Sequence, residues 1–288
     1  MANEVVHDAD AALTAALQLS MEQEARVGLV APQFYSVVDI SGQPTLAYKV
    51  SKHPSTTDAA AITDGTAMSN TTINPTSVTI TASGVGLKTV VTGFSQRGSL
   101  LDLQEAAANF GRALINKMDV DGCSILDNFS TTAGSTGVDM SVANALSAIY
   151  SLELANEFRD PVFILHPIQI SDLRSAIVAA SNGHFFAGDP GSGGIVNNTG
   201  IPNFKGYLFG VPVYSSSNVP SVNSDADRGG ALLSKGRALK WVWKWMPTVE
   251  TLAAPSYGAG SIELAVSACY GFGEVFDGAG VSIITDHE

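Results

Sequence analysis

The stretch from Ser95 to Phe129 constrains the fold of this chain most, because it has the pattern of one long amphipathic helix. Ser99 and Asp102 form a capping box, which supplies partners for the first turn of a helix. Apolar or small side chains then recur at the spacing of one helical face, opposite a polar face. The apolar positions are Leu103, Ala107, Phe110, Leu114 and Met118, and the polar positions are Gln104, Glu105, Arg112, Lys117 and Asp119. The sequence therefore predicts a helix that buries one side and carries Asp119 on its polar side.

Residues 34–94, before this helix, have the alternating pattern of β-strands. Two strand-like arms flank a polar, Thr-rich middle that is poor in large apolar groups. This pattern predicts a long hairpin, at about residues 46–84, that projects from the body. A hairpin of this kind has no core of its own and needs a neighbouring surface to become ordered. Lys49, Lys52 and Lys88 lie on or near it, and we expect them to be solvated charges on edge strands.

Residues 1–30 form an acidic amphipathic arm, in which Leu13, Leu17 and Met21 have helical spacing. Gly28 and Pro32 separate this arm from the strands that follow. The arm is therefore expected to pack as a helix, and two surfaces are open to it. One belongs to another subunit, and the other belongs to its own domain.

A compact α/β lobe is expected after the long helix. Thr131 to Val138 reads as a loop rich in Gly, Ser and Thr, and Ser141 caps a helix that follows it. A buried strand, VFILH, and a third helix, IQISDLRSAIVAA, come next. Alternating strands fill the rest of the chain, and the last three are expected within residues 250–286. The fold class is therefore α+β.

Composition favours a chain that meets other proteins. Only 15% of the 288 residues are charged, 45% are hydrophobic and 28 are glycine, and the cores of protein interfaces are depleted in charge. The net charge of −12 disfavours binding to nucleic-acid phosphates. Two distant cysteines, Cys123 and Cys269, form no disulfide framework, so we expect the protein to occupy a reducing compartment. Both thiols are expected to be buried inside the fold. No run is long and apolar enough to span a membrane, and we expect no secretion signal.

Candidate chemistry is sparse. None of the five histidines has metal-ligand spacing, so we expect no metal and no cofactor. His166 lies between a strand and Pro167, where a local hydrogen-bonding role is expected. Ser192 lies in the glycine-rich segment 183–200, which matches no protease, phosphate-binding or dinucleotide pattern and is read as a loop. Trp241, Trp243 and Trp245 alternate, so a strand would place all three on one face, for packing or for stacking on bases or sugars.

The order of these parts resembles the major capsid protein of tailed phages, which has the Hong Kong 97-like fold. TVVTGFSQRGSLLDLQEAAANFGRALINKMDVDGCSILDN resembles the spine helix of that family with the strand before it. FILHPIQISDLRSAI, YLFGVPVYSSSNVPS and GGALLSKGRALKWV resemble its lobe. The resemblance covers nearly the whole chain. It implies an N-terminal arm (1–33), peripheral-domain strands with an extended loop (34–94), a spine helix (95–130), an axial domain (131–240) and C-terminal strands shared by both domains (241–288).

The resemblance also implies a function without catalysis. Many copies would form pentamers and hexamers of an icosahedral shell that encloses double-stranded DNA without sequence-specific binding. A separate scaffolding protein and a portal are further expected partners, and the presence of a decoration protein stays open. Assembly is expected in the host bacterial cytoplasm, with a final place in the virion. Gly111 and Gly122 mark where the spine helix could bend. The candidates for contacts between subunits are Leu13, Leu17, Met21, Lys49, Lys52, Ile62, Met68, Trp241, Trp243 and Trp245.

Three other functions remain open from the sequence. The first, within the same fold, is the shell of an encapsulin-type nanocompartment that houses a cargo enzyme. The second is a hydrolase that uses Ser192 or His166. The third is a carbohydrate-binding β module that uses the three tryptophans.

Overall fold

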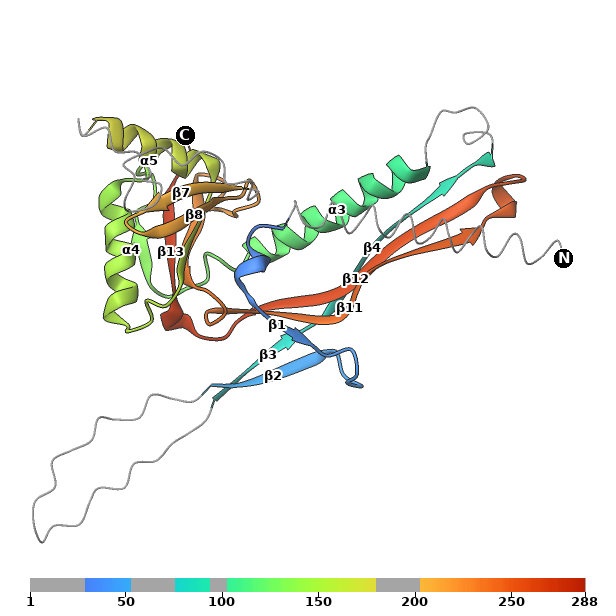
Figure 1. Ribbon diagram of the computed structural model, residues 1–288, viewed down its shortest axis with the longest axis horizontal. Coiled ribbons are helices and arrows are strands. Elements are labelled where there is room, and N and C mark those ends of the chain that lie inside the picture. The colour runs from blue at the N-terminus through green and yellow to red at the C-terminus, as the bar shows by residue number, and fades with distance from the viewer. Residues whose placement is uncertain (1–28, 53–75, 94–102, 180–202, 288) are drawn as a thin grey trace, which may run out of the picture.

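The computed structural model describes residues 29–52, 76–93, 103–179 and 203–287. Within these residues the chain forms two large sheets, a separate two-stranded hairpin and three α-helices. Figure 1 shows two bodies. One is a long, twisted ribbon of strands with a single helix beside it, and the other is a lobe in which two helices cover a mixed sheet. The predicted α+β class is confirmed.

The ribbon is a four-stranded sheet in the order β1 (Ser36–Asp39), β11 (Leu239–Ala253), β12 (Ile262–Glu274) and β4 (Ser83–Val91). β1 runs parallel to β11, and the other neighbours are antiparallel. β11 and β12 are the longest described strands, and the short 3-10 helix η2 (Pro255–Tyr257) lies in the connection between them. Because β11 and β12 are each paired on both sides, they form the centre of the ribbon.

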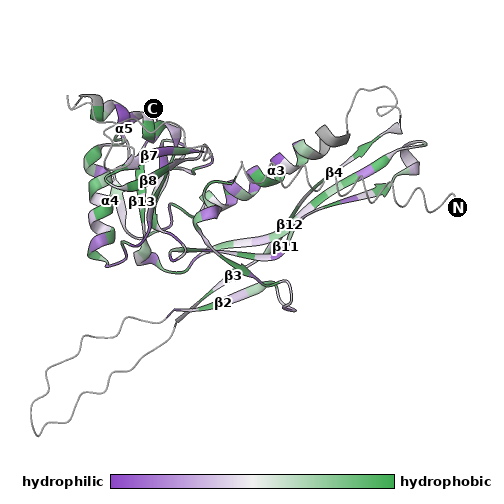
Figure 2. Cartoon of the chain, in the orientation of Figure 1, coloured by the Kyte–Doolittle hydropathy of each residue, from purple (hydrophilic) through white to green (hydrophobic). Residues whose placement is uncertain are grey.

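Helix α3 (Leu103–Cys123) lies along one face of the ribbon and contacts β12 and β4. The predicted apolar side is buried at Leu114 and Met118, and Ile115 is buried beside them. Figure 2 shows hydrophilic and hydrophobic segments alternating along α3, as an amphipathic helix requires. The predicted capping box, Ser99 with Asp102, lies outside the described residues.

The lobe contains the second sheet, in the order β5 (Thr132–Gly134), β13 (Gly280–Asp286), β10 (Asp227–Ser234), β6 (Pro161–Leu165), β8 (Val211–Ser215) and β7 (Phe204–Leu208). β9 (Ser221–Val222) pairs with β10 away from this path. The short helix η3 (Asp277–Ala279) precedes β13. The predicted buried strand is confirmed as β6, since Val162 to Leu165 are fully enclosed.

Helices α4 (Val142–Leu154) and α5 (Pro167–Ala179) belong to this lobe. The predicted cap of α4 is confirmed, because the backbone N–H of Asn144 donates to Oγ of Ser141 at 3.2 Å. The prediction of a plain loop at residues 131–138 was wrong in part. Three of its residues form β5, which runs parallel to β13 about 150 positions later. A strand this short has no local signal and depends on its distant partner.

The base of the predicted hairpin is confirmed as the antiparallel pair β2 (Ala47–Lys52) and β3 (Thr76–Thr81). Figure 1 shows the pair leaving the ribbon at an angle. It is anchored by a small apolar cluster on the ribbon face opposite α3, which includes Ile40, Ile80, Val242 and Cys269. The middle of the hairpin, residues 53–75, lies outside the described residues.

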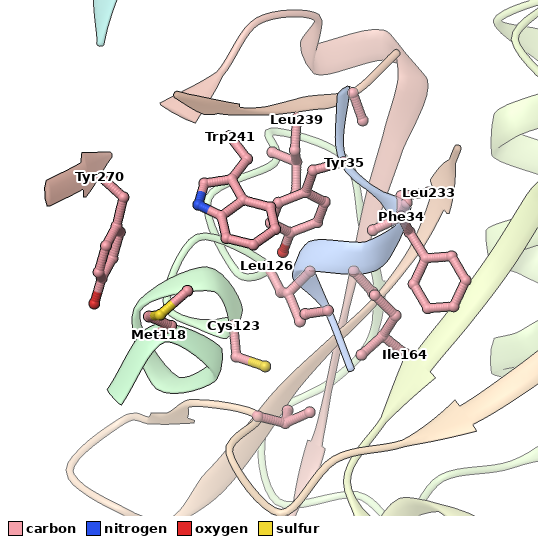
Figure 3. Close-up of a cluster of buried hydrophobic side chains, with 14 of the residues drawn as sticks. Phe34, Tyr35, Met118, Cys123, Leu126, Ile164, Leu233, Leu239, Trp241 and Tyr270 are labelled. Carbon is pink, nitrogen blue, oxygen red and sulfur yellow. The ribbon is translucent and has the colours of Figure 1, made fainter. Parts of the chain in front are cut away.

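The largest apolar cluster joins the two bodies. Figure 3 shows its side chains converging from α3, from the short helix η1 (Pro32–Phe34) and from both sheets. Trp241 and Tyr270 come from the ribbon, and Ile164 and Leu233 come from the lobe. The two sheets therefore share one continuous core. A second cluster fills the lobe between its sheet and the helices α4 and α5.

Candidate assembly surfaces

Asp119 on α3 is the polar centre of the junction where the N-terminal segment joins the body. It is completely buried. Its Oδ1 accepts hydrogen bonds from the backbone N–H groups of Val30 (2.7 Å) and Ala31 (3.1 Å). Its Oδ2 accepts from Oγ of Ser216 (2.8 Å) and Nδ2 of Asn218 (2.9 Å). One carboxyl group thus ties the start of the described chain and a loop of the lobe to α3.

The prediction that Asp119 lies on the polar side of the helix was therefore wrong. Burial of a carboxyl group is tolerated because donors on both of its oxygens replace water. Those donors lie about 90 and 100 positions away in sequence, and two of them are backbone groups. No local pattern identifies such a site, which is why the sequence did not reveal it.

Tyr35 and Cys123 complete this junction. The Tyr35 hydroxyl donates to the carbonyl of Gly122 at 2.6 Å, and burial, with Cys123 and Asp119 nearby, raises the pKa of Tyr35 well above its usual value. Burial and then Asp119 also raise the pKa of the Cys123 thiol. Both predicted buried cysteines are confirmed. Since only a thiolate is an effective nucleophile, Cys123 is inert at neutral pH.

The two glycines proposed as bend points lie in different surroundings. A Cβ atom added at Gly122 would lie 2.7 Å from Cγ of Pro32, so close packing of η1 against α3 requires this glycine. Gly111 is buried within α3, which runs uninterrupted through it. The structure gives Gly122 a packing role, and bending at either position stays a prediction.

The three tryptophans do not share one face, and this prediction was wrong. Trp241 and Trp243 are 7% and 6% exposed, whereas Trp245 is 45% exposed. The pairing of β11 with β12 shifts between Trp243 and Trp245, where a β-bulge places two steps of β11 against one step of β12. Trp243 pairs with Tyr270 and Trp245 pairs with Cys269, so Trp245 lies on the face of the hairpin cluster, opposite α3.

The buried and the exposed tryptophans have different roles. Trp241 and Trp243 lie with their ring centroids 4.3 Å apart inside the main core, which confirms them as packing anchors. They present no aromatic plane to solvent, so a stripe of three stacking rings does not exist. Trp245 and the neighbouring Met246 are exposed apolar side chains next to the bulge.

The hairpin base presents a charged surface. Lys49 is exposed on β2, and Lys52 is half-buried near Glu274. Burial, together with Asp277, raises the pKa of Glu274, and Lys52 opposes this shift. Lys88 lies on the edge strand β4 and forms an exposed ion pair with Glu263 at 2.9 Å. The predicted position of Lys88 on an edge strand is therefore confirmed.

Five of the predicted contact residues, Leu13, Leu17, Met21, Ile62 and Met68, lie outside the described residues. Ser192 lies outside them as well.

His166 has a local structural role, as predicted. Its Nδ1 accepts a hydrogen bond from the backbone N–H of Ile168 at 3.3 Å, which caps the first turn of α5. Burial, with Arg228 and His287 nearby, lowers the pKa of His166 to about 4. Across the described ranges no group of His, Cys, Asp and Glu side chains is arranged to hold a metal ion. None of the described helices has the length and hydropathy needed to cross a membrane.

The comparisons with known proteins identify the fold. No family model matches the sequence, and no curated protein matches it. Solved structures do match the fold along most of the chain. A structure of Mycobacterium phage Che8 matches with a TM-score of 0.67 and 18% identity, over 88% of this chain and 90% of the other. The capsid of the cyanophage P-SCSP1u matches with a TM-score of 0.66 and 13% identity, over 91% and 90%.

A virus-like particle from Pyrococcus furiosus also matches, with a TM-score of 0.59 and 12% identity, over 94% of this chain and 97% of the other. The chain therefore has the fold of phage capsid structures. At identities this low, the likeness establishes the fold alone.

Proposed function

We propose that this chain is a major capsid protein of a tailed phage, many copies of which assemble into an icosahedral shell around double-stranded DNA. One observation carries the proposal: the fold matches phage capsid structures over about nine tenths of both chains, with no large part left over. An inserted catalytic domain would have left an unmatched segment. The role we propose is structural, and it requires no catalytic residue.

We assign the parts in the terms of the Hong Kong 97-like fold. The ribbon with α3 is the peripheral domain, drawn from residues 34–130, and the lobe is the axial domain, drawn from residues 131–240. Residues 241–288 serve both, since β11 and β12 lie in the ribbon and β13 lies in the lobe. Residues 1–33 are the N-terminal arm. The hairpin on β2 and β3 is the extended loop.

Contacts between copies follow from this assignment. Asp119 holds Val30 and Ala31, at the end of the arm, against the body. In this proposal the arm carries Leu13, Leu17 and Met21 to a neighbour. The hairpin carries Lys49 and Lys52 at its base and Ile62 and Met68 beyond. Trp245 supplies an exposed apolar contact at the bulge. Buried Trp241 and Trp243 hold the ribbon rigid beneath it.

Further partners complete the proposal. A separate scaffolding protein guides assembly in the host bacterial cytoplasm, a portal occupies one vertex, and a decoration protein binds the finished shell. The net charge of −12 leaves the wall free of strong attraction to DNA phosphates, so the shell encloses DNA without sequence-specific binding.

Expression of the full chain, alone and with the products of its neighbouring genes, tests the proposal. Particles sedimented from the lysate are expected to show icosahedral shells by negative-stain electron microscopy. A chain that stays monomeric in every combination would refute it.

A second candidate is a nanocompartment shell that encloses a cargo enzyme, favoured by the match to the virus-like particle from Pyrococcus furiosus. The contents of purified particles separate the two functions. Nuclease-protected double-stranded DNA supports the phage capsid. A co-purifying enzyme in particles without DNA supports the compartment.

A further inference from the structure

Helix α4 carries an apolar stripe on its outer side. Leu146, Tyr150 and Leu154 follow each other at intervals of four residues and are 45%, 63% and 69% exposed. The opposite side of the same helix packs into the lobe through Ala145, Ala148, Ile149 and Leu152, which are buried. Side chains four residues apart lie on one helical face, so the three form one continuous strip. Exposed apolar strips of this kind mark interaction surfaces.

The turn between β7 and β8 carries a second apolar feature. Phe209 is 52% exposed there, and Tyr207 on β7 is exposed beside it. The register of Leu208 with Val211 leaves a two-residue turn, in which Phe209 has φ of 52° and Gly210 has φ of 79°. Such turns favour Asn at the first position, because a bulky side chain is strained at positive φ. The turn therefore holds an exposed aromatic ring where local conformation disfavours one.

These two features lie at opposite ends of one sheet. α4 packs against β13 and β5, at one end of the strand order, and β7 is the edge strand at the other end. Their neighbouring charges are opposite in sign. Glu153 is exposed next to the α4 stripe, and Lys205 is exposed two residues before Tyr207 on β7. Neither forms an ion pair among the described residues.

We infer that the α4 stripe of one copy receives the β7–β8 turn of the next copy, with Phe209 against Tyr150 and Leu154 and with Lys205 facing Glu153. The inference rests on the proposed function and identifies the contact that closes its rings. A head-to-tail contact between two different patches repeats around a rotation axis and forms a ring if the rotation closes. This contact joins neighbouring lobes around the ring, in keeping with the axial place that the proposed function gives the lobe.

Cross-linking tests the contact directly. The native thiols are buried, so Leu154→Cys and Phe209→Cys introduce the accessible ones. In assembled protein that carries both substitutions, a flexible bismaleimide is expected to produce a ladder of bands that ends at five and six copies. An equal mixture of the two single variants should stop at dimers, because each copy then carries only one accessible thiol. Cross-linked dimers of the Leu154→Cys variant alone, or no ladder in assembled double variant, would overturn the inference.

Substitutions that reverse the two charges, and one substitution in the β7–β8 turn, provide a second test. Glu153→Lys and Lys205→Glu are each expected to weaken assembly by about tenfold, because each opposes like charges across the contact. The double reversal restores the attraction and should recover the particle yield. Phe209→Asn suits the turn, so it should preserve or raise the thermal stability of the unassembled chain while it lowers the particle yield.

The outcomes separate this contact from the proposed function. Wild-type particles combined with unchanged yields for Phe209→Asn and for both single reversals would overturn the contact and leave the capsid function standing. A wild-type chain that forms no particles would overturn both.

Discussion

Asp119 orders its surroundings because donors from two distant parts of the chain share its buried carboxyl group. Two of the donors are backbone N–H groups at the exit of the N-terminal arm, and two are side chains of the lobe. A buried donor that loses its acceptor retains the cost of its desolvation. The positions of Val30 and Ala31 and the stability of the body are thus coupled through one residue.

Asp119→Ala is expected to lower the free energy of unfolding by about 3 kcal/mol, since it leaves several buried donors unsatisfied. Urea denaturation of the unassembled chain measures the loss. Asp225→Asn, an exposed substitution of an aspartate in the same lobe, is the control and should change little. A loss for Asp119→Ala no greater than that of the control would show that the junction is held by other contacts.

The lowered pKa of His166 predicts that the stability of the fold depends on pH. Its folded pKa of about 4 lies below the ordinary value of 6.5, so between these values the unfolded chain binds more protons than the folded chain. Its contribution is therefore present above pH 6.5 and is lost as the pH falls toward 4. For a half-buried group the loss is on the order of 1 kcal/mol after solvent screening.

Asn can cap α5 in place of His but does not titrate. In His166→Asn, unfolding measured from pH 7 to 4 should therefore lack this part of the decline. Identical pH profiles for the variant and the wild-type chain would show that His166 does not titrate differently on folding.

At the scale of elements, the β-bulge in β11 places tryptophans of one strand on opposite faces of the ribbon. Before the bulge its tryptophans lie in the core against α3, and after it Trp245 lies on the opposite face of the ribbon. The alternation of the sequence predicted the strand correctly. It could not predict the bulge, because the shift depends on how β11 pairs with β12.

Trp241→Ala and Trp245→Ala should therefore differ greatly in their effect on the stability of the fold. Loss of the buried ring should destabilise the fold by about 3–5 kcal/mol, and loss of the exposed ring by less than about 0.5 kcal/mol. Under the proposed function, Trp245→Ala should instead reduce the yield of particles. Denaturation and size-exclusion chromatography of both variants measure the two effects. If Trp245→Ala unfolds the chain as readily as Trp241→Ala, the assignment of the two rings to different roles fails.

The junction of η1 with α3 gives a matched pair of substitutions. Gly122→Ala should destabilise by about 1–3 kcal/mol, because its methyl group would overlap Pro32. Pro32→Ala removes that overlap, so the double variant should be more stable than the sum of the two single losses. Simple additivity in this cycle would contradict the packing role.

At the scale of the whole molecule, local signals predicted the elements and missed the contacts between them. The cap at Ser141, the apolar run of β6 and the hydrophobic period of α3 are local, and each predicted its element. The burial of Asp119, the side of Trp245 and the existence of β5 depend on partners far away in sequence. The outer stripe of α4 was not singled out either, because an apolar helix face is expected to be buried within its own chain.

One core shared by the ribbon and the lobe makes the described body a single building block. The hairpin and the exposed apolar surfaces lie outside this core, at Trp245, on α4 and at the β7–β8 turn. Under the proposed function, each of these features contacts a neighbouring copy.

A cryo-electron microscopy reconstruction of the purified assembly tests this account most directly. The account predicts a closed icosahedral shell in which rings of five and six copies place their lobes at the ring centres and each hairpin lies over a neighbouring copy. A closed shell with the ribbons at the ring centres, or an assembly without five-fold rings, would contradict it.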